Sequence, residues 1–205
     1  MTTLEGFRTK ARNFLKDVGT QKVSDAELLD YLTYALADYS YRFPKGVVAT
    51  ESAAATIAKP SAALPGESVD GIEIDGDFWE EFTFRQSASL PTTGQYWYWR
   101  GSETIVFAST PAADIGVHYR SLRDIPSADD DVLDVSVADE ELLVIYVAAK
   151  YHQKVGTIAA KLDRFKEEGR RDDNPLVFMH DVLMRQYEEA CSWRAHKGTV
   201  RIRSY

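Results

Sequence analysis

The spacing of apolar residues changes twice along this chain, and that change constrains the fold more than any other feature of the sequence. Up to about residue 45, and again from about 136 to 197, apolar residues recur at three- and four-residue steps, which is typical of amphipathic helices. Between Val69 and Ser121 they recur with a period of about two, as in half-buried strands. The sequence therefore predicts helices at both ends of the chain and strands in the middle.

Start and stop signals delimit these helices. Ser24 followed by Glu27 forms a capping box, and Asn174 followed by Pro175 is a cap plus a first helical residue. Gly198 is a C-terminal stop. The helices expected from these signals cover approximately residues 4–18, 24–43, 136–165 and 175–197. The two helices before the strand region cannot cover their apolar faces by themselves, and neither can the two helices after it. We therefore expect helices from the two ends of the chain to pack together.

The packing of these helices is expected to join residues that are distant in sequence. Leu143, Val147 and Tyr151 should lie against Leu32, Leu36 and the face from Leu183 to Tyr187. The middle region should form about five strands, with turn residues at Asp75-Gly76, Thr93-Gly94 and Arg100-Gly101-Ser102. Residues 46–67 are rich in Ala, Ser, Thr, Gly and Pro, which predicts a connecting loop.

The predicted fold class is α+β: a helical bundle from both ends of the chain, with an inserted antiparallel β block and an extended C-terminal tail. Residues 1–45 and 136–197 would form the bundle, and residues 46–135 the inserted β domain with its linkers. Residues 198–205 would form a tail that docks on a partner.

Charge narrows the class of partner. The net charge of -8 opposes general affinity for DNA, RNA or an anionic membrane, because all three are polyanionic. Residues 60–84 and 124–141 carry acids and no base, whereas the last twelve residues carry four bases and no acid. A single cysteine, the absence of a long apolar run and an N-terminus unlike a signal peptide lead us to expect a cytoplasmic protein without disulfides or membrane spans.

Motifs of catalysis and cofactor binding are missing from the sequence. Neither a phosphate-binding glycine motif nor a GxSxG elbow occurs, and the four histidines are scattered. Glu80 and Glu81 are adjacent, so on a strand they would point to opposite faces and could not act on one bond. We therefore expect no catalytic residues, no cofactor, no metal and no enzymatic activity.

Several stretches, taken in order, resemble the head-to-tail connector (adaptor) proteins of tailed bacteriophages. The stretches that carry the resemblance are apolar and turn residues: Leu64-Pro65 ahead of Val69-Asp70-Gly71-Ile72, the strand 104–107 followed by Pro111, the strand 115–122, and the acidic helix start 139–151. The resemblance implies a structural subunit of the virion neck, made in the host cytoplasm. Such a subunit forms a ring, here expected to be dodecameric, joins the portal protein to tail components, and lines a channel through which DNA passes as cargo.

The C-terminal tail is the predicted partner-binding element. After Gly198, apolar and basic residues alternate, which suits a strand added to the edge of a partner's sheet, and the resemblance implies docking on the portal through such a segment. The predicted partner-binding residues are Arg194, Lys197, Val200, Arg201, Ile202, Arg203 and Tyr205. Two alternatives stay open: a frayed terminus without a partner, and a carbohydrate- or protein-binding module that uses an aromatic face of residues 96–99.

Overall fold

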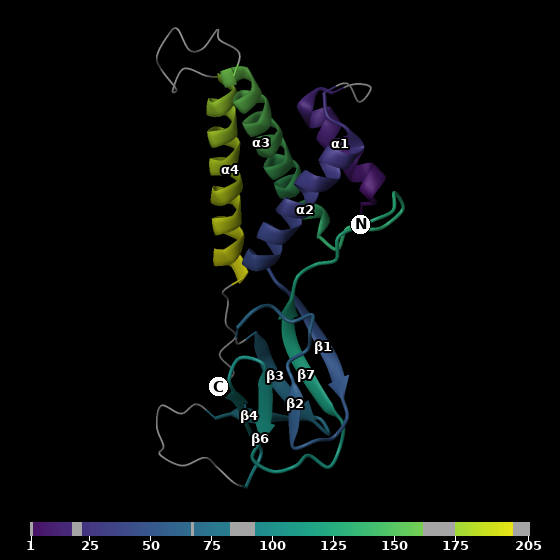
Figure 1. Cartoon of the computed structure of the whole chain (residues 1–205), viewed down its shortest axis with the longest axis vertical. Coiled ribbons are helices and arrows are strands. Elements are labelled where there is room, and N and C mark those ends of the chain that lie inside the picture. Colours follow the sequence, from purple (N-terminus) through teal and green to yellow (C-terminus); the bar gives the residue numbers. More distant parts are fainter. Residues whose placement is uncertain (1, 18–21, 67, 83–92, 162–174, 199–205) are drawn as a thin grey trace. The chain divides into compact units, whose positions relative to one another are not determined.

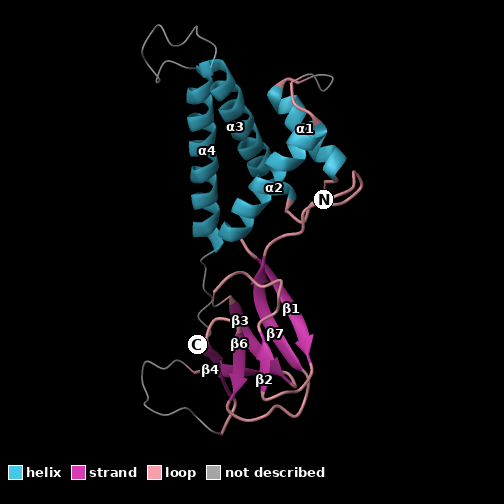
Figure 2. Ribbon diagram, viewed as in Figure 1, coloured by secondary structure: helices cyan, strands magenta, loops and turns pink. Residues whose placement is uncertain are grey.

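The structure is a computed structural model, and it describes residues 2–17, 22–66, 68–82, 93–161 and 175–198. The chain divides into two compact units. Residues 1–43 and 123–205 form a helical unit, and residues 44–122 form a β unit inserted into it. In Figure 2 the described helices all belong to the first unit and the strands to the second.

The helical unit contains four helices within the described residues: α1 (Leu4–Leu15), α2 (Asp25–Arg42), α3 (Val137–Lys161) and α4 (Pro175–Gly198). The predicted capping box is confirmed, since Ser24 Oγ accepts from the Glu27 backbone and the Glu27 side chain accepts from Ser24 N. The predicted start of α4 at Pro175 is also confirmed. Helix α1 ends before the predicted Val18, because Lys16 adopts a left-handed conformation with φ 52°.

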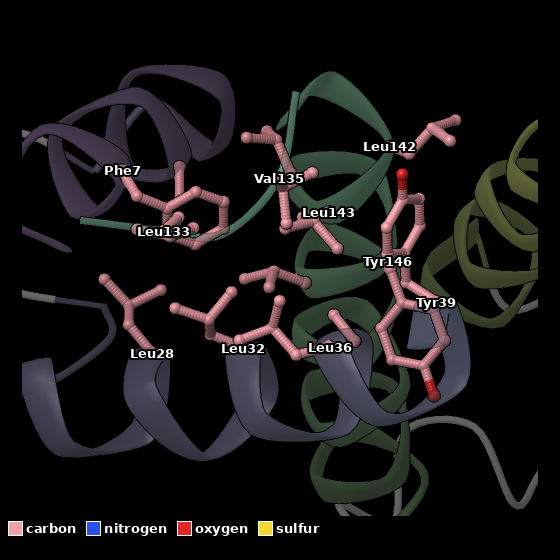
Figure 3. Close-up of a cluster of buried hydrophobic side chains, with 14 of the residues drawn as sticks. Phe7, Leu28, Leu32, Leu36, Tyr39, Leu133, Val135, Leu142, Leu143 and Tyr146 are labelled. Atoms are coloured by element: carbon pink, nitrogen blue, oxygen red, sulfur yellow. The ribbon is translucent and has the colours of Figure 1, made fainter. Parts of the chain in front are cut away.

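One hydrophobic core joins both ends of the chain, as Figure 3 shows. The predicted packing is confirmed for Leu32, Leu36, Leu143, Val147 and Tyr187, which share this cluster. Each of these side chains is almost completely buried, and burying one leucine stabilises the fold by roughly 1.5–3 kcal/mol. Helices α3 and α4 run side by side in Figure 1, and Leu183 packs with Ala148 and Ala149 in an adjoining cluster.

The segment between β unit and α3 belongs to the helical unit, although the sequence assigned it to the β domain as an acidic linker. Leu133 and Val135 are buried in the helical core, and Leu133 N donates to Thr2 O at 3.0 Å. Arg123 begins this segment, and its Nε donates to Asp134 O at 2.7 Å while its guanidinium lies 4.8 Å from the centre of the Tyr39 ring. The acidic residues of this segment suggested a solvated linker, although Leu133 and Val135 alternate with them and hold the segment in the core.

The predicted fold class is wrong for the sheet, which is mixed rather than antiparallel and has seven strands rather than about five. Its order is β1-β7-β3-β4-β5-β6-β2, and the β4–β5 pair is parallel. The strands are β1 (Lys45–Glu51), β2 (Thr56–Ala58), β3 (Val69–Ile74), β4 (Asp77–Glu81), β5 (Tyr96–Arg100), β6 (Thr104–Phe107) and β7 (Ile115–Ser121). Of the predicted tail, only Gly198 is described, and it ends α4; residues 199–205 lie outside the described residues.

Composition explains the two strands that were predicted as a loop. The β1 strand is built mostly from small residues, yet Val47 and Ala49 contact the core of the β unit and the whole strand pairs with β7. Burial of this kind depends on the neighbouring strand, which a local composition cannot reveal. The alternation of apolar and polar residues likewise predicts that a strand exists but does not indicate its direction in the sheet. The parallel pairing of β4 with β5 could therefore not be predicted from the sequence.

The hairpin between β3 and β4 shows why the turn signals were informative. Asp75 and Gly76 both take positive φ values, 54° and 84°, which a two-residue hairpin turn of this kind needs.

The aromatic run of β5 also follows the alternation of a strand. Trp97 and Trp99 lie on the same face of β5 and are in contact, with ring centroids 6.0 Å apart. Trp97 is buried in the core of the β unit with Ile72 and Ile105, so one pair of the aromatic run fills the core, as expected.

Candidate docking surface

The C-terminal turn of α4 is anchored to the start of α3. Arg194 forms an ion pair with Asp139, and its Nη2 donates to Ala138 O at 2.5 Å. Arg194 is the one predicted partner-binding residue whose side chain is described. Its guanidinium therefore binds within its own chain and holds the last turns of α4 against the start of α3.

Asp139 collects further hydrogen bonds. Tyr39 at the end of α2 and Ser136 before α3 each donate a hydroxyl to Asp139 Oδ2 at 2.7 Å. Burial opposes the charge of this carboxylate, but the bonds from Ser136 and Tyr39 and the charge of Arg194 outweigh it and lower the pKa of Asp139 below its ordinary value of 3.8. Burial and the bond to Asp139 raise the pKa of Tyr39, which stays a protonated donor.

A second polar link joins α4 to α2 about two turns earlier in α4. Tyr187 is fully buried and donates its hydroxyl to Asp38 Oδ2 at 2.7 Å, and Arg42 Nε donates to the same oxygen at 2.7 Å. Cys191 is buried on the same face, and burial raises the pKa of its thiol, which disfavours a reactive thiolate. The last turns of α4 are therefore rigidly attached to the helical unit.

Trp193 is an apolar residue of α4 that faces away from the core, and 72% of its surface is exposed. Tyr187 and Cys191 define the inner face at a four-residue step, and a residue two positions beyond Cys191 lies on the opposite face. The spacing of Trp193 from Tyr187 and Cys191 in the sequence could have indicated that it is exposed. A large exposed aromatic beside a fixed arginine is a common anchor in protein interfaces.

The structure describes little of the other predicted partner-binding residues. Lys197 lies in the last turn of α4, but its side chain is outside the described residues, as are Val200, Arg201, Ile202, Arg203 and Tyr205. Their role in docking stays a prediction. The described part of the candidate docking surface is thus the outer side of the last turn of α4, around Trp193 and Arg194.

Residues weighed for catalysis do not come together. Glu80 and Glu81 are both exposed on β4. His118 Nε2 lies 2.9 Å from Glu73 Oε2 on the sheet, whereas His180 Nδ1 lies 3.0 Å from Ala149 O in the helical unit. In the part of the chain that the structure covers, no group of three or more His, Cys, Asp or Glu side chains is arranged to hold a metal ion.

The aromatic run considered for carbohydrate binding is largely turned inward. Trp97 and Tyr98 are buried, and Trp97 Nε1 donates to Trp79 O at 3.1 Å. Tyr96 and Trp99 are half-buried. A flat, open stacking platform would need these rings at the surface, so the geometry favours a role for them in the core.

Comparison with known proteins adds no identity to this geometry. Among the described residues, no helix combines the length and the apolar character that crossing a membrane requires. No protein-family model and no curated protein sequence matches the chain.

Proposed function

We propose that the chain is a structural, non-catalytic subunit of a phage neck, which joins the portal ring to the tail and lines the channel for DNA. The observation that supports this proposal most is the order of the elements. A helical unit formed by both ends of the chain, with a β unit inserted between α2 and α3, is the arrangement that the sequence resemblance implies. Its place of action would be the virion neck, after synthesis in the host cytoplasm.

The end of α4 supports docking through the tail. Arg194 and Tyr187 attach the last turns of α4 to α3 and α2, so the tail starts from a fixed point beside the exposed Trp193. A fixed starting point lowers the entropy cost of ordering a short segment on a partner. The portal protein is the proposed partner at this surface.

The distribution of acids supports a channel that does not retain DNA. In the β unit Asp70, Asp75, Asp77, Glu80 and Glu81 are all exposed. Exposed carboxylates repel phosphates, and this repulsion lets a duplex slide past without binding. The basic residues that follow Arg194 are confined to the tail, where the proposed partner is a protein.

The test is binding to the portal protein encoded in the same phage genome. The full chain should bind purified portal rings, whereas a chain truncated after Gly198 should fold with an unchanged melting temperature and lose this binding. Trp193→Ala should weaken binding at least tenfold, because truncating an interface tryptophan often costs about 2 kcal/mol or more. Phe178→Ala is the matched control, since Phe178 is an exposed aromatic near the other end of α4.

Two outcomes would contradict the proposal. One is a full-length chain that shows no binding to portal rings at any salt concentration. The other is a truncated chain that binds with undiminished affinity, which would remove the tail from the interface.

A further inference from the structure

A hollow of about 560 Å³ lies between α2 and α3 on the helical unit. Every side chain that lines it within the described residues can donate a hydrogen bond, and none is a carboxylate. The lining residues are Tyr31, Tyr34, Lys150, Gln153, Lys154 and Thr157. Two of these side chains, Lys150 and Lys154, are cationic, so the hollow is suited to an acidic group.

The two lysines differ in what they already bind. Lys154 forms an ion pair with Glu27, the capping residue of α2. Lys150 forms no ion pair with any carboxylate in the described part of the chain, and its Nζ lies 5.4 Å from the centre of the Tyr146 ring. The charge of Lys150 is therefore available to an incoming acid, beside the exposed donors Tyr34 and Gln153.

The loop of residues 127–131 before α3 presents exposed acids on a fixed backbone. Asp131 Oδ2 accepts hydrogen bonds from the backbone of Ser127 at 2.7 Å and of Ala128 at 2.8 Å, and Asp129 forms an ion pair with Arg8 of α1. Asp130 lies between these two residues, is exposed, and has no hydrogen bond or ion pair to other described residues. Because both of its neighbours are held, the position of Asp130 is held as well.

This loop is too far from the hollow to fill it within one subunit. The loop leads into α3 at Val137, and Lys150 lies thirteen residues further along that helix, a separation of roughly 20 Å at 1.5 Å per residue. A contact between loop and hollow must therefore join two copies of the chain. It would use a different surface on each copy, and such heterologous contacts form a ring where the rotation between copies closes and a filament where it does not.

We infer that the acidic loop of residues 127–131 of one subunit occupies the hollow between α2 and α3 of the next, with Asp130 against Lys150. This inference rests on the proposed function, and it names the contact through which the ring closes. Duplex DNA is the less suitable occupant, because the hollow has the size of a loop tip and the net charge of -8 opposes polyanions.

The experiment is sedimentation of the full chain at low and at high salt. Gln153→Glu adds one carboxylate to the hollow with almost no change of shape, and Asp130→Asn removes one from the loop in the same way. Each should weaken self-association by about two- to fivefold, as loss or repulsion of one exposed charge pair predicts. Glu188→Gln is the isosteric control, because Glu188 is exposed on the outer side of α4, and it should leave self-association unchanged.

Charge exchange provides a second readout. Lys150→Glu and Asp130→Lys should each weaken association, and a mixture of the two variants should associate again, because each loop then meets a hollow of opposite charge. Unchanged association of Gln153→Glu and Asp130→Asn, or failure of the exchange to restore it, would overturn the inference. A loss of duplex-DNA retention by Gln153→Glu, with self-association intact, would also overturn it.

Cross-linking checks the contact without relying on affinity. Chains with Gln153→Cys mixed with chains with Ala128→Cys keep both charges of the proposed pair and should be joined by a short bismaleimide, while the native Cys191 is buried and should not react. Absence of a mixed product would contradict the contact. Portal binding, measured in parallel, separates the two proposals. A wild-type chain that binds portal rings, with charge variants that leave self-association unchanged, contradicts this inference alone. A wild-type chain that self-associates through this contact but does not bind portal rings contradicts the proposed function.

Discussion

At the scale of single residues, Asp139 connects three helices. It accepts hydrogen bonds from Tyr39 at the end of α2 and from Ser136 before α3, and it pairs with Arg194 of α4. Arg194, Tyr39 and Asp139 are far apart in sequence, and no motif announced that they meet. The predicted partner-binding role of Arg194 followed from the basic character of the C-terminal stretch and from the family resemblance, and neither can reveal a partner within the chain.

Replacing Asp139 by Asn should destabilise the helical unit by about 1–3 kcal/mol, because Arg194 and Tyr39 would lose their charged acceptor. Urea unfolding, followed by the helical circular dichroism signal, measures this loss. Asp30→Asn is the matched control on the exposed side of α2 and should stay within about 0.5 kcal/mol of the wild type. Equal stability of Asp139→Asn and wild type would show that the network contributes nothing.

The same carboxylate predicts a pH dependence. The pKa of Asp139 is lowered in the folded state, so its contribution is complete above its ordinary pKa of 3.8 and is lost as the pH falls through the lower folded value. The difference in stability between wild type and Asp139→Asn should therefore be constant near neutral pH and shrink below about pH 4. A difference that grew on acidification would have the wrong sign for this network.

At the scale of helices and strands, local signals predicted the elements that depend on local chemistry. The capping box at Ser24, the start at Pro175 and the turn at Asp75-Gly76 satisfy nearby backbone groups, and all three were readable from the sequence. Strands β1 and β2 depend on distant partners, so their small residues suggested a loop. The parallel direction of β5 depends on the chain path between strands, which alternation does not encode.

The helical core also belongs to this scale, and its pairing is testable. Leu36→Ala and Leu183→Ala remove buried side chains and should each lower the free energy of unfolding by about 2–5 kcal/mol. Val137→Ala is the control within α3, since 65% of Val137 is exposed, and should cost less than about 0.5 kcal/mol. If either leucine variant unfolded at the same urea concentration as wild type, the packing of α2 or α4 on α3 would be wrong.

At the scale of the whole molecule, the separation of charge is the feature that bears most on function. The acids of the β unit and of the loop before α3 contrast with the bases that follow Arg194 and with the lysines of the hollow. The sequence showed the acidic stretches and the basic tail, but the hollow was not predictable because α2 and α3 contribute to it from either side of the inserted unit. The apolar residues of the last helix marked the helix, but they did not by themselves distinguish the exposed Trp193 from the buried Tyr187.

Self-association should weaken with salt, since its proposed contacts are between exposed charges. Sedimentation of the isolated chain should show a monomer at high ionic strength and weak, concentration-dependent association at low ionic strength. A stable ring in dilute, high-salt solution would mean that apolar surfaces dominate the contact, against the charge-based assembly proposed for this subunit.

The central proposal is most directly tested by the mass of the complex between the chain and its portal ring. Native mass spectrometry of purified portal rings mixed with excess chain should show one added copy of the chain for each portal subunit, while the chain alone stays monomeric or weakly associated. Portal rings that keep their own mass in the presence of the full-length chain would contradict a role in the phage neck.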